Sequence, residues 1–122
     1  MPSDLFWRMN TEKTADDKAM GEKHAPVITV PGTIKAGEKF TVRLHAGGGK
    51  HPNLSEHHFE WMELRVNGLP VSRVDFAAAI MEPLAEFTLT CPQHRKIDEI
   101  SAIARCNVHG LWESKIAPNI VD

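Results

Sequence analysis

Short stretches of alternating apolar and polar residues run through most of the chain. In the segment 38–46, Phe40, Val42 and Leu44 alternate with polar residues, which gives the segment one apolar face and one polar face. A period of two residues is typical of a β-strand with one buried face. The same reasoning predicts strands over 25–30, 38–46, 57–66, 71–79, 84–91, 99–106 and 111–118.

Turn-forming residues separate the predicted strands. Asn67-Gly68 is a strong hairpin signal, and residues 47–53 (GGGKHPN) have the composition of a loop. About seven short strands with no long helix predict an all-β fold, an immunoglobulin-like antiparallel β-sandwich. Residues 1–20 are polar and are predicted to form a short arm, weakly helical or flexible, whereas residues 21–122 form the β-sandwich domain.

Composition narrows the class of protein. A net charge of -2 is too close to zero to favour nucleic acid or a membrane as partner, and no apolar run reaches the length of a membrane span. The N-terminal residues lack the basic and apolar blocks of a secretory signal. The two cysteines, fifteen positions apart, do not form a disulfide framework. Free thiols suit a reducing compartment, so we expect a cytoplasmic protein.

Candidate metal ligands lie in loops or at strand ends, where a sandwich gathers functional groups. Cys106 and His109 form a Cys-x-x-His sequence, which lets one tight turn offer two ligands to one ion, and Gly110 allows the chain to bend there. That motif is weak alone, but nearby histidines in other loops strengthen it. Imidazole and thiolate groups suit iron, zinc or copper. The candidate ligands are His24, His51, His57, Cys106 and His109.

Other chemically active residues have simpler interpretations. Cys91 ends an apolar strand face and is expected in the core. His58 is adjacent to His57 and points to the opposite face, so we expect it not to be a ligand. The segment 47–50 lacks the Gly-Lys-Ser/Thr ending of a phosphate-binding loop. Trp61 and Trp112 are expected in the core or the wall of the site. His45 lies on the polar face of its strand and is expected to be exposed or hydrogen-bonded, and His94 is expected in a surface loop.

Three segments together resemble the superoxide reductases, specifically the one-iron neelaredoxin type of the desulfoferrodoxin family. They are EKHAP (22–26), HPNLSEHH (51–58) and CNVHGLWESK (106–115), in the family's order. The family's EKHVP reads EKHAP here. The two-iron relatives carry an additional N-terminal domain with four cysteine ligands. Because this chain has no cysteine before Cys91, we expect one iron ion per chain.

The resemblance also implies a role for each matching residue. Glu22 would occupy the sixth position of the oxidised iron, and Lys23 would attract the anionic substrate. Lys50, which adjoins another ligand, would add positive charge that speeds the encounter. The iron ligands would be four equatorial imidazoles and one axial thiolate: His24, His51, His57, His109 and Cys106.

The implied activity is the one-electron reduction of superoxide to hydrogen peroxide without dismutation. A rubredoxin-like protein would supply the electron, and the protein would be a homo-oligomer, a tetramer by resemblance. Backbone N–H groups of Val108 and His109 are predicted to point at the Cys106 sulfur and to tune the potential of the iron.

Four other functions are compatible with parts of the pattern. A cupredoxin would need a methionine after His109, but the methionines are at positions 1, 9, 20, 62 and 81. A structural zinc site is normally closed with four ligands, one fewer than the candidates here. A Cys–His hydrolase would not need three further histidines. A superoxide dismutase is the closest chemical alternative.

Overall fold

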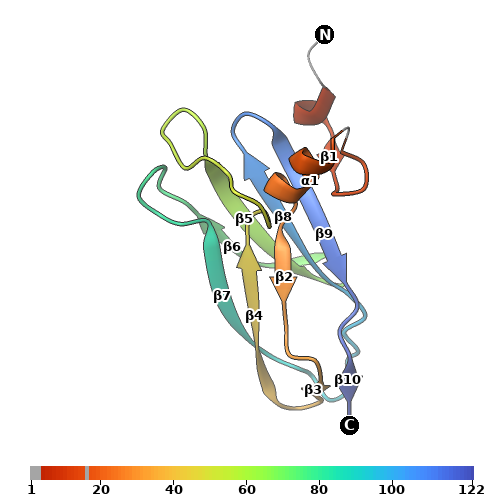
Figure 1. The fold of residues 1–122 in the computed structure, drawn as a ribbon. Helices are drawn as coiled ribbons and strands as arrows, with labels where there is room; N and C mark the ends of the chain where they lie inside the picture. Colours follow the sequence, from red (N-terminus) through yellow and green to blue (C-terminus); the bar gives the residue numbers. More distant parts are fainter. Residues whose placement is uncertain (1–3, 16) are drawn as a thin grey trace.

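The structure is a computed structural model that describes residues 4–15 and 17–122. Among the described residues, eight strands lie in two facing sheets (Figure 1), one with the order β1-β9-β8-β5-β6 and the other with the order β2-β4-β7, while β10 and β3 form a separate pair. The elements are η1 (Asp4–Trp7), β1 (Met9–Asn10), α1 (Lys18–His24), β2 (Val27–Thr29), β3 (Ile34–Lys35), β4 (Lys39–His45), β5 (Phe59–Val66), β6 (Leu69–Asp75), β7 (Leu84–Thr90), β8 (Ile100–Cys106), β9 (Gly110–Ile116) and β10 (Ile120–Val121).

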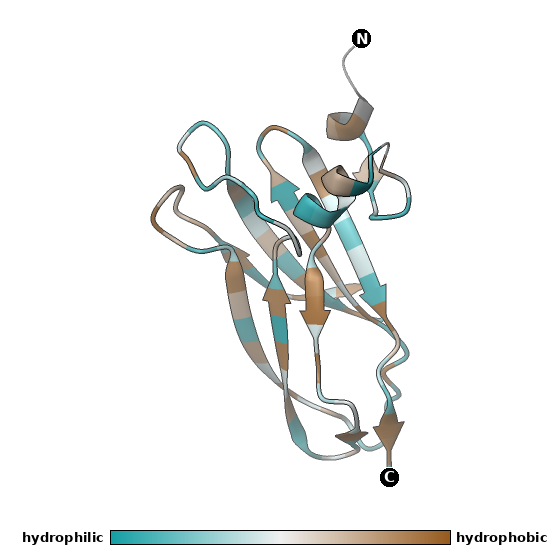
Figure 2. Cartoon of the chain, viewed as in Figure 1, coloured by the Kyte–Doolittle hydropathy of each residue, from teal (hydrophilic) through white to brown (hydrophobic). Residues whose placement is uncertain are grey.

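The core lies between the two sheets and is built from the apolar positions of the alternating strands. Val42 and Leu44 of β4 and Met62 and Leu64 of β5 are fully buried. The alternation appears as bands of brown and teal along β4 and β7 in Figure 2. β8 is buried almost throughout because it lies between β5 and β9 in the centre of its sheet. The alternating pattern therefore determines which face of each strand packs against the opposite sheet.

The all-β architecture confirms the prediction, and each of the seven predicted strands has a counterpart. The structure also differs in two respects. It adds three two-residue strands, β1, β3 and β10. The seven predicted strands pair with one another in antiparallel fashion, as expected, whereas the added pairs β1–β9 and β3–β10 are parallel. A strand of two residues is too short to show a periodic pattern of apolar and polar residues in the sequence.

All seven predicted strands are shorter in the structure, and two of them show where the chain departs from the sheet. The strand predicted over 71–79 ends at Asp75, where the chain turns, and Ala79 has a positive φ of 67°. The strand predicted from residue 57 begins at Phe59, and His57 instead forms an isolated bridge with Leu54. This shortening leaves His57 in the loop that precedes β5.

The N-terminal segment packs against the five-stranded sheet. β1 pairs with β9, and the buried Asn10 side chain donates to the backbone oxygens of Leu5 and Leu111. α1 begins after Asp17, whose carboxylate accepts a hydrogen bond from the backbone N–H of Ala19. The division of the chain at residue 20 stays a prediction, and that position falls within α1. This packing brings α1 to the end of the sandwich where the loops 46–58 and 107–109 also lie (Figure 1).

Candidate metal centre

Five side chains with metal-binding atoms meet at one end of the sandwich. Each offers one nitrogen or sulfur atom, and these atoms all lie within 4.8 Å of one another. Within residues 4–15 and 17–122, this is the one group of three or more His, Cys, Asp or Glu side chains with such geometry. Its members are the candidate ligands predicted from the sequence: His24, His51, His57, Cys106 and His109.

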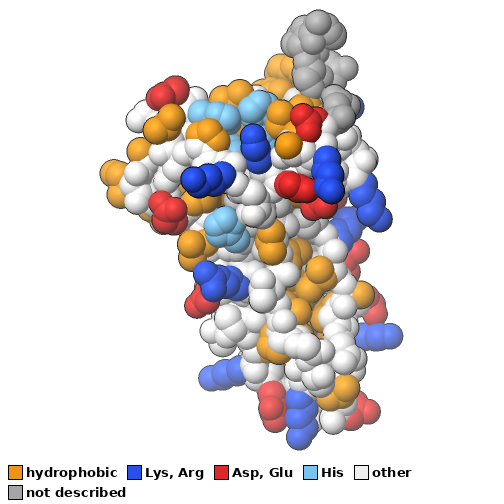
Figure 3. Space-filling model, in the orientation of Figure 1, with side chains coloured by type: hydrophobic (Ala, Val, Ile, Leu, Met, Phe, Trp, Pro, Cys, Tyr) orange, Lys and Arg blue, Asp and Glu red, His pale blue; other side chains and the backbone are white. Residues whose placement is uncertain are grey.

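Separate elements deliver these side chains to the site. His24 is the last residue of α1, and His51 and His57 lie in the loop between β4 and β5. Cys106 ends β8, and the pairing of β8 with β9 reaches as far as Cys106 and residue 110, so the three-residue turn between them holds His109 next to the cysteine. Histidine side chains reach the surface at this end of the molecule, beside basic side chains (Figure 3).

The ring nitrogens and the sulfur face a common point. His24 Nε2 lies 3.2 Å from His51 Nε2, and Cys106 Sγ lies 3.4 Å from His51 Nε2 and 3.8 Å from His109 Nδ1. Ligand atoms about 2.0–2.3 Å from one ion are about 3 Å apart. His57 Nε2 is buried and has no hydrogen-bond partner among the described residues. A metal ion at this point would satisfy that nitrogen, so the residues fit a metal centre.

Backbone carbonyls orient two of the imidazole rings. His24 Nδ1 lies 2.8 Å from the carbonyl oxygen of Met20, and His51 Nδ1 lies 2.7 Å from that of Pro52. A carbonyl oxygen can only accept, so each Nδ1 carries the proton and donates it. This assignment leaves the lone pair on Nε2, the atom that faces the common point. Pro52 thus holds the ring of its neighbour His51 through its carbonyl oxygen.

Burial keeps the imidazoles of the site uncharged. It lowers the pKa of both His24 and His51 from 6.5 to about 4, because the charged form loses its hydration. Burial also lowers the pKa of His57 and that of His109. Neutral imidazoles at neutral pH are the form that binds metal ions.

Cys106 is fully buried, and that burial raises the pKa of its thiol. Backbone N–H groups of His109 and Val108 oppose the shift by bonding to the sulfur, and the His109 nitrogen lies 3.4 Å from Sγ. The structure thus confirms the predicted hydrogen bonding of the turn to the sulfur. A bound cation would drive the thiol toward the thiolate.

Trp112 has a closer relation to the site than the sequence indicated. It is fully buried, and its indole ring stacks on His24 with centroids 5.0 Å apart and an angle of 22° between the planes. Its Nε1–H donates to the carbonyl oxygen of His109 at 3.2 Å. One side chain therefore contacts two of the five residues. The sequence predicted that Trp112 lies in the core or the wall of the site, but not these two contacts.

Glu22 and Lys23 lie in the last turn of α1 and are both exposed. The Glu22 carboxylate is not part of the five-residue group and lies 3.9 Å from Lys18 Nζ on the same helix. Lys23 is close enough that its positive charge, after the larger effect of burial, lowers the pKa of His51 and that of His109. Its charge therefore acts at the site where an anion would arrive.

Gly110 is required for a reason that the sequence did not reveal. Its φ is 83°, and a Cβ atom there would lie 2.8 Å from the Cα of Phe6. The close approach is to the N-terminal segment, in addition to the bend expected after His109. A side chain at this position would push that segment off the sheet.

The remaining candidates lie elsewhere. Cys91 is buried in the core between the sheets, as predicted. His58 Nδ1 lies 3.1 Å from the carbonyl oxygen of Leu54, and His45 Nδ1 lies 2.6 Å from that of Gly47. His94 is exposed. None of these four residues belongs to the five-residue group.

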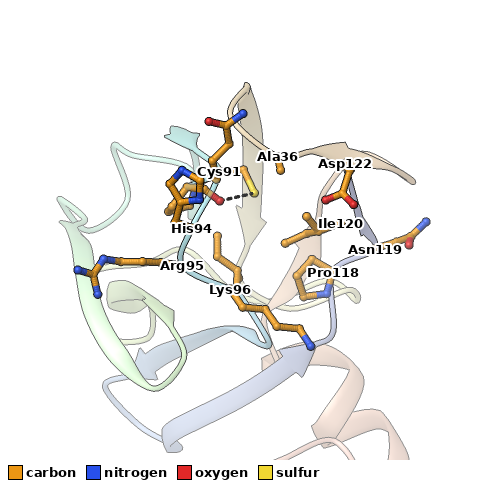
Figure 4. A pocket seen from close by; sticks show the side chains of 12 residues that line it. Ala36, Cys91, His94, Arg95, Lys96, Pro118, Asn119, Ile120 and Asp122 are labelled. Carbon is orange, nitrogen blue, oxygen red and sulfur yellow. Dashed lines mark hydrogen bonds between the residues drawn. The ribbon is translucent and has the colours of Figure 1, made fainter.

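A cavity of about 510 Å³ lies at the opposite end of the sandwich. Figure 4 shows that its walls include Cys91, Lys96 and Ile120. None of the five residues of the candidate metal centre lines this cavity. Among the described residues, no helix is long and apolar enough to cross a membrane.

Comparison with known proteins places the chain in a family. Residues 15–115 match the desulfoferrodoxin family. The chain is 35% identical over 117 residues to the superoxide reductase of Pyrococcus abyssi, a match that covers 88% of this chain and 95% of that one. The superoxide reductase of Pyrococcus furiosus is 34% identical over 117 residues, with 79% and 88% covered.

Solved structures agree with the sequence comparison. The superoxide reductase (neelaredoxin) from Ignicoccus hospitalis superimposes with a TM-score of 0.78 at 31% identity, and 97% of each chain is covered. The family recognised from the three sequence segments is therefore confirmed. The chain belongs to the desulfoferrodoxin family and is similar to its neelaredoxin-type members.

Proposed function

We propose that the protein is a superoxide reductase, which reduces superoxide to hydrogen peroxide by one electron without dismutation. The observation that carries the proposal is the convergence of five donor atoms within 4.8 Å, one of them a buried nitrogen without a hydrogen-bond partner. The named relatives support the choice of substrate. The residues that would hold a single iron ion are His24, His51, His57, Cys106 and His109.

The donor set supports iron over the alternatives. Four imidazoles and one thiolate exceed the four ligands of a closed zinc site and leave one position free in a six-coordinate arrangement. Bound iron would supply a one-electron couple and an open position for a small anion. Burial keeps the four imidazoles neutral, so the thiolate would be the only anionic protein ligand among the five.

The surroundings of the site suit an anionic substrate. Lys23 places positive charge beside two of the imidazoles, and it attracts superoxide toward them. Lys50 immediately precedes His51 and adds to the same field. Glu22 reaches the oxidised site from the last turn of α1 in our proposal, and it returns to Lys18 when the site is reduced.

Reduction of one superoxide ion consumes one electron and two protons. No titratable side chain of the five-residue group is free to deliver protons once it binds the metal, so solvent is the proposed proton source. A small redox protein of the rubredoxin type is the proposed electron donor. We also propose a homotetramer and a cytoplasmic location, where the two free cysteines stay reduced.

The test begins with the visible spectrum of the purified, oxidised protein. A long-wavelength thiolate-to-iron band that bleaches on reduction is expected. Stopped-flow mixing of the reduced protein with superoxide should then yield one hydrogen peroxide per superoxide consumed and no oxygen. One peroxide for every two superoxide ions, with oxygen released, would show a dismutase instead. A colourless protein that contains zinc or no metal would contradict the proposal.

A further inference from the structure

The three glycines that follow β4, Gly47 to Gly49, contact the backbone at the end of α1. The N–H groups of Gly48 and Gly49 both donate to the carbonyl oxygen of Glu22, at 2.8 and 2.7 Å. This oxygen lies in the last turn of a seven-residue helix, where carbonyls lack partners within the helix. The glycine loop therefore caps α1 from outside, and we call this contact the triglycine clamp.

Gly47 brings the two backbones into direct contact. Its φ is 80°, and a Cβ atom at this position would lie 2.0 Å from the carbonyl oxygen of Lys23 and 2.7 Å from its carbonyl carbon. Both atoms belong to backbone, which cannot rotate away as a flexible side chain can. A residue with any side chain at position 47 would therefore force the loop and the end of α1 apart.

The clamp lies beside two of the proposed ligands. It joins the backbone of Glu22 and Lys23, which directly precede His24, to the loop that leads through Lys50 into His51. The pairing of β2 with β4 stops at Val27 opposite His45, short of both ligands. Beyond that pair, the clamp joins the two segments that carry His24 and His51, whose Nε2 atoms lie 3.2 Å apart.

We propose that the triglycine clamp is a positioning device of the metal centre, with Gly47 as its essential residue. It holds the segment from Glu22 to His24 in register with His51, so that both imidazoles and the Lys23 charge are in place before a metal ion arrives. The role assigned to the clamp rests on the proposed metal site, whereas its contacts are independent of the reaction. Supports of this kind typically affect metal affinity about 10- to 100-fold.

The test compares Gly47→Ala with a matched control, Gly68→Ala. Gly68 has nearly the same φ, 81°, but a Cβ atom there would meet nothing within 4 Å. Both variants therefore place an alanine at a similar positive φ, and only the first breaks the clamp. Metal-free full-length protein is titrated with Co²⁺, with the cobalt absorption as readout, and its thermal unfolding is measured separately.

Gly47→Ala should bind Co²⁺ about 10- to 100-fold more weakly and shift the cobalt spectrum. Gly68→Ala should keep the affinity and spectrum of the unchanged protein, even where its melting temperature falls. Wild-type affinity in a folded Gly47→Ala variant would overturn the proposal. An equal loss of affinity in Gly68→Ala would also overturn it, because general strain would then explain both.

A second measurement needs no variant and decides the matter if Gly47→Ala does not fold. Coupling between two sites is reciprocal, so a clamp that favours metal binding must itself be stabilised by the metal. Addition of Zn²⁺, which is diamagnetic, should slow hydrogen exchange at the amides of Gly48 and Gly49. The amide of Asn67, bonded to Glu99 far from the site, serves as control. Unchanged exchange at the two glycines would reject the clamp as a positioning device.

Failure of the proposed function is distinguishable from failure of the clamp. An iron-loaded wild-type protein that does not reduce superoxide would refute the function, yet the Co²⁺ and exchange results would still stand. The converse outcome, normal superoxide reduction with Co²⁺ affinity insensitive to Gly47→Ala, would refute only the clamp.

Discussion

The chain contains the sequence Cys-x-x-His twice, at opposite ends of the sandwich, and within the described residues only one copy lies in a group of side chains that could hold a metal ion. Cys106 and His109 flank a tight turn between paired strands and meet three further histidines. Cys91 and His94 flank the start of the long connection from β7 to β8, with Pro92 between them. There Cys91 is buried in the core and His94 is exposed. Ligand spacing along the chain thus makes a site only where other segments converge on it.

The largest expected effect is the difference between a substitution of Cys106 and the same substitution of Cys91. Cys106→Ser is expected to abolish the thiolate-to-iron absorption and nearly all superoxide reduction, because a serine hydroxyl is a poor substitute for the sulfur. Cys91→Ser should leave the spectrum intact but lower the free energy of unfolding by about 1–3 kcal/mol, since it buries a hydroxyl in the core. Visible spectra and thermal melts of both variants measure this. A retained band in Cys106→Ser would refute the ligand assignment.

Low pH should destabilise the metal-free protein through the buried histidines of the five-residue group. The pKa of His24 falls from 6.5 to about 4 on folding, so between these values the unfolded chain binds a proton that the folded protein does not. Stability of the metal-free protein is therefore full above about pH 6.5 and should decline as pH falls toward 4, by about 1.4 kcal/mol per pH unit for this histidine.

Urea unfolding of metal-free protein between pH 7 and pH 4 measures that slope. His24→Gln serves as the matched variant, and its slope should be shallower because the glutamine amide does not titrate in this range. Equal slopes in the two proteins would show that His24 is not the group whose protonation destabilises the fold.

A smaller effect on metal affinity should distinguish Trp112, which contacts the candidate metal centre, from Trp61, which does not. Trp112→Phe keeps a ring against His24 but removes the N–H that donates to His109, so metal affinity should fall by about tenfold. Trp61 contacts the Arg73 guanidinium instead, with the cation 4.1 Å from the ring, so Trp61→Phe should not change metal binding. Co²⁺ titration of both variants tests this, and equal affinities would assign Trp112 to packing alone.

The smallest expected effect is on the rate of reaction with superoxide, when a lysine is removed from one end of the sandwich or from the other. Lys23→Ala should slow the bimolecular reaction with superoxide by a factor of about 2–10 and flatten its dependence on ionic strength, because local positive charge steers anions. Lys96→Ala, at the opposite end and paired with Asp98, should change neither quantity. Stopped-flow rates at low and high salt provide the comparison. An equal response to both substitutions would mean that only net charge matters.

Much of the fold was predictable because its main strands carry local signals. Phe40, Val42 and Leu44 alternate with polar residues, and the structure buries all three. Asn67 and Gly68 have φ values of 51° and 81°, both positive as the tight hairpin turn requires. The three segments with recognisable motifs likewise identified the five residues that meet at one end.

Contacts between distant segments carried no such signal. α1 is seven residues long, and a helix of that length is marginal without tertiary packing, so only its docking could reveal it. Trp112 and the glycines of the clamp acquire their roles from His24 and Lys23, which are far away in sequence. Local periodicity and motifs by themselves determined the seven main strands, the family and the candidate donor atoms. The tertiary structure decided what holds those atoms in place. The supporting residues contact segments that are distant in the sequence, and the spacing of residues along the chain does not predict such contacts.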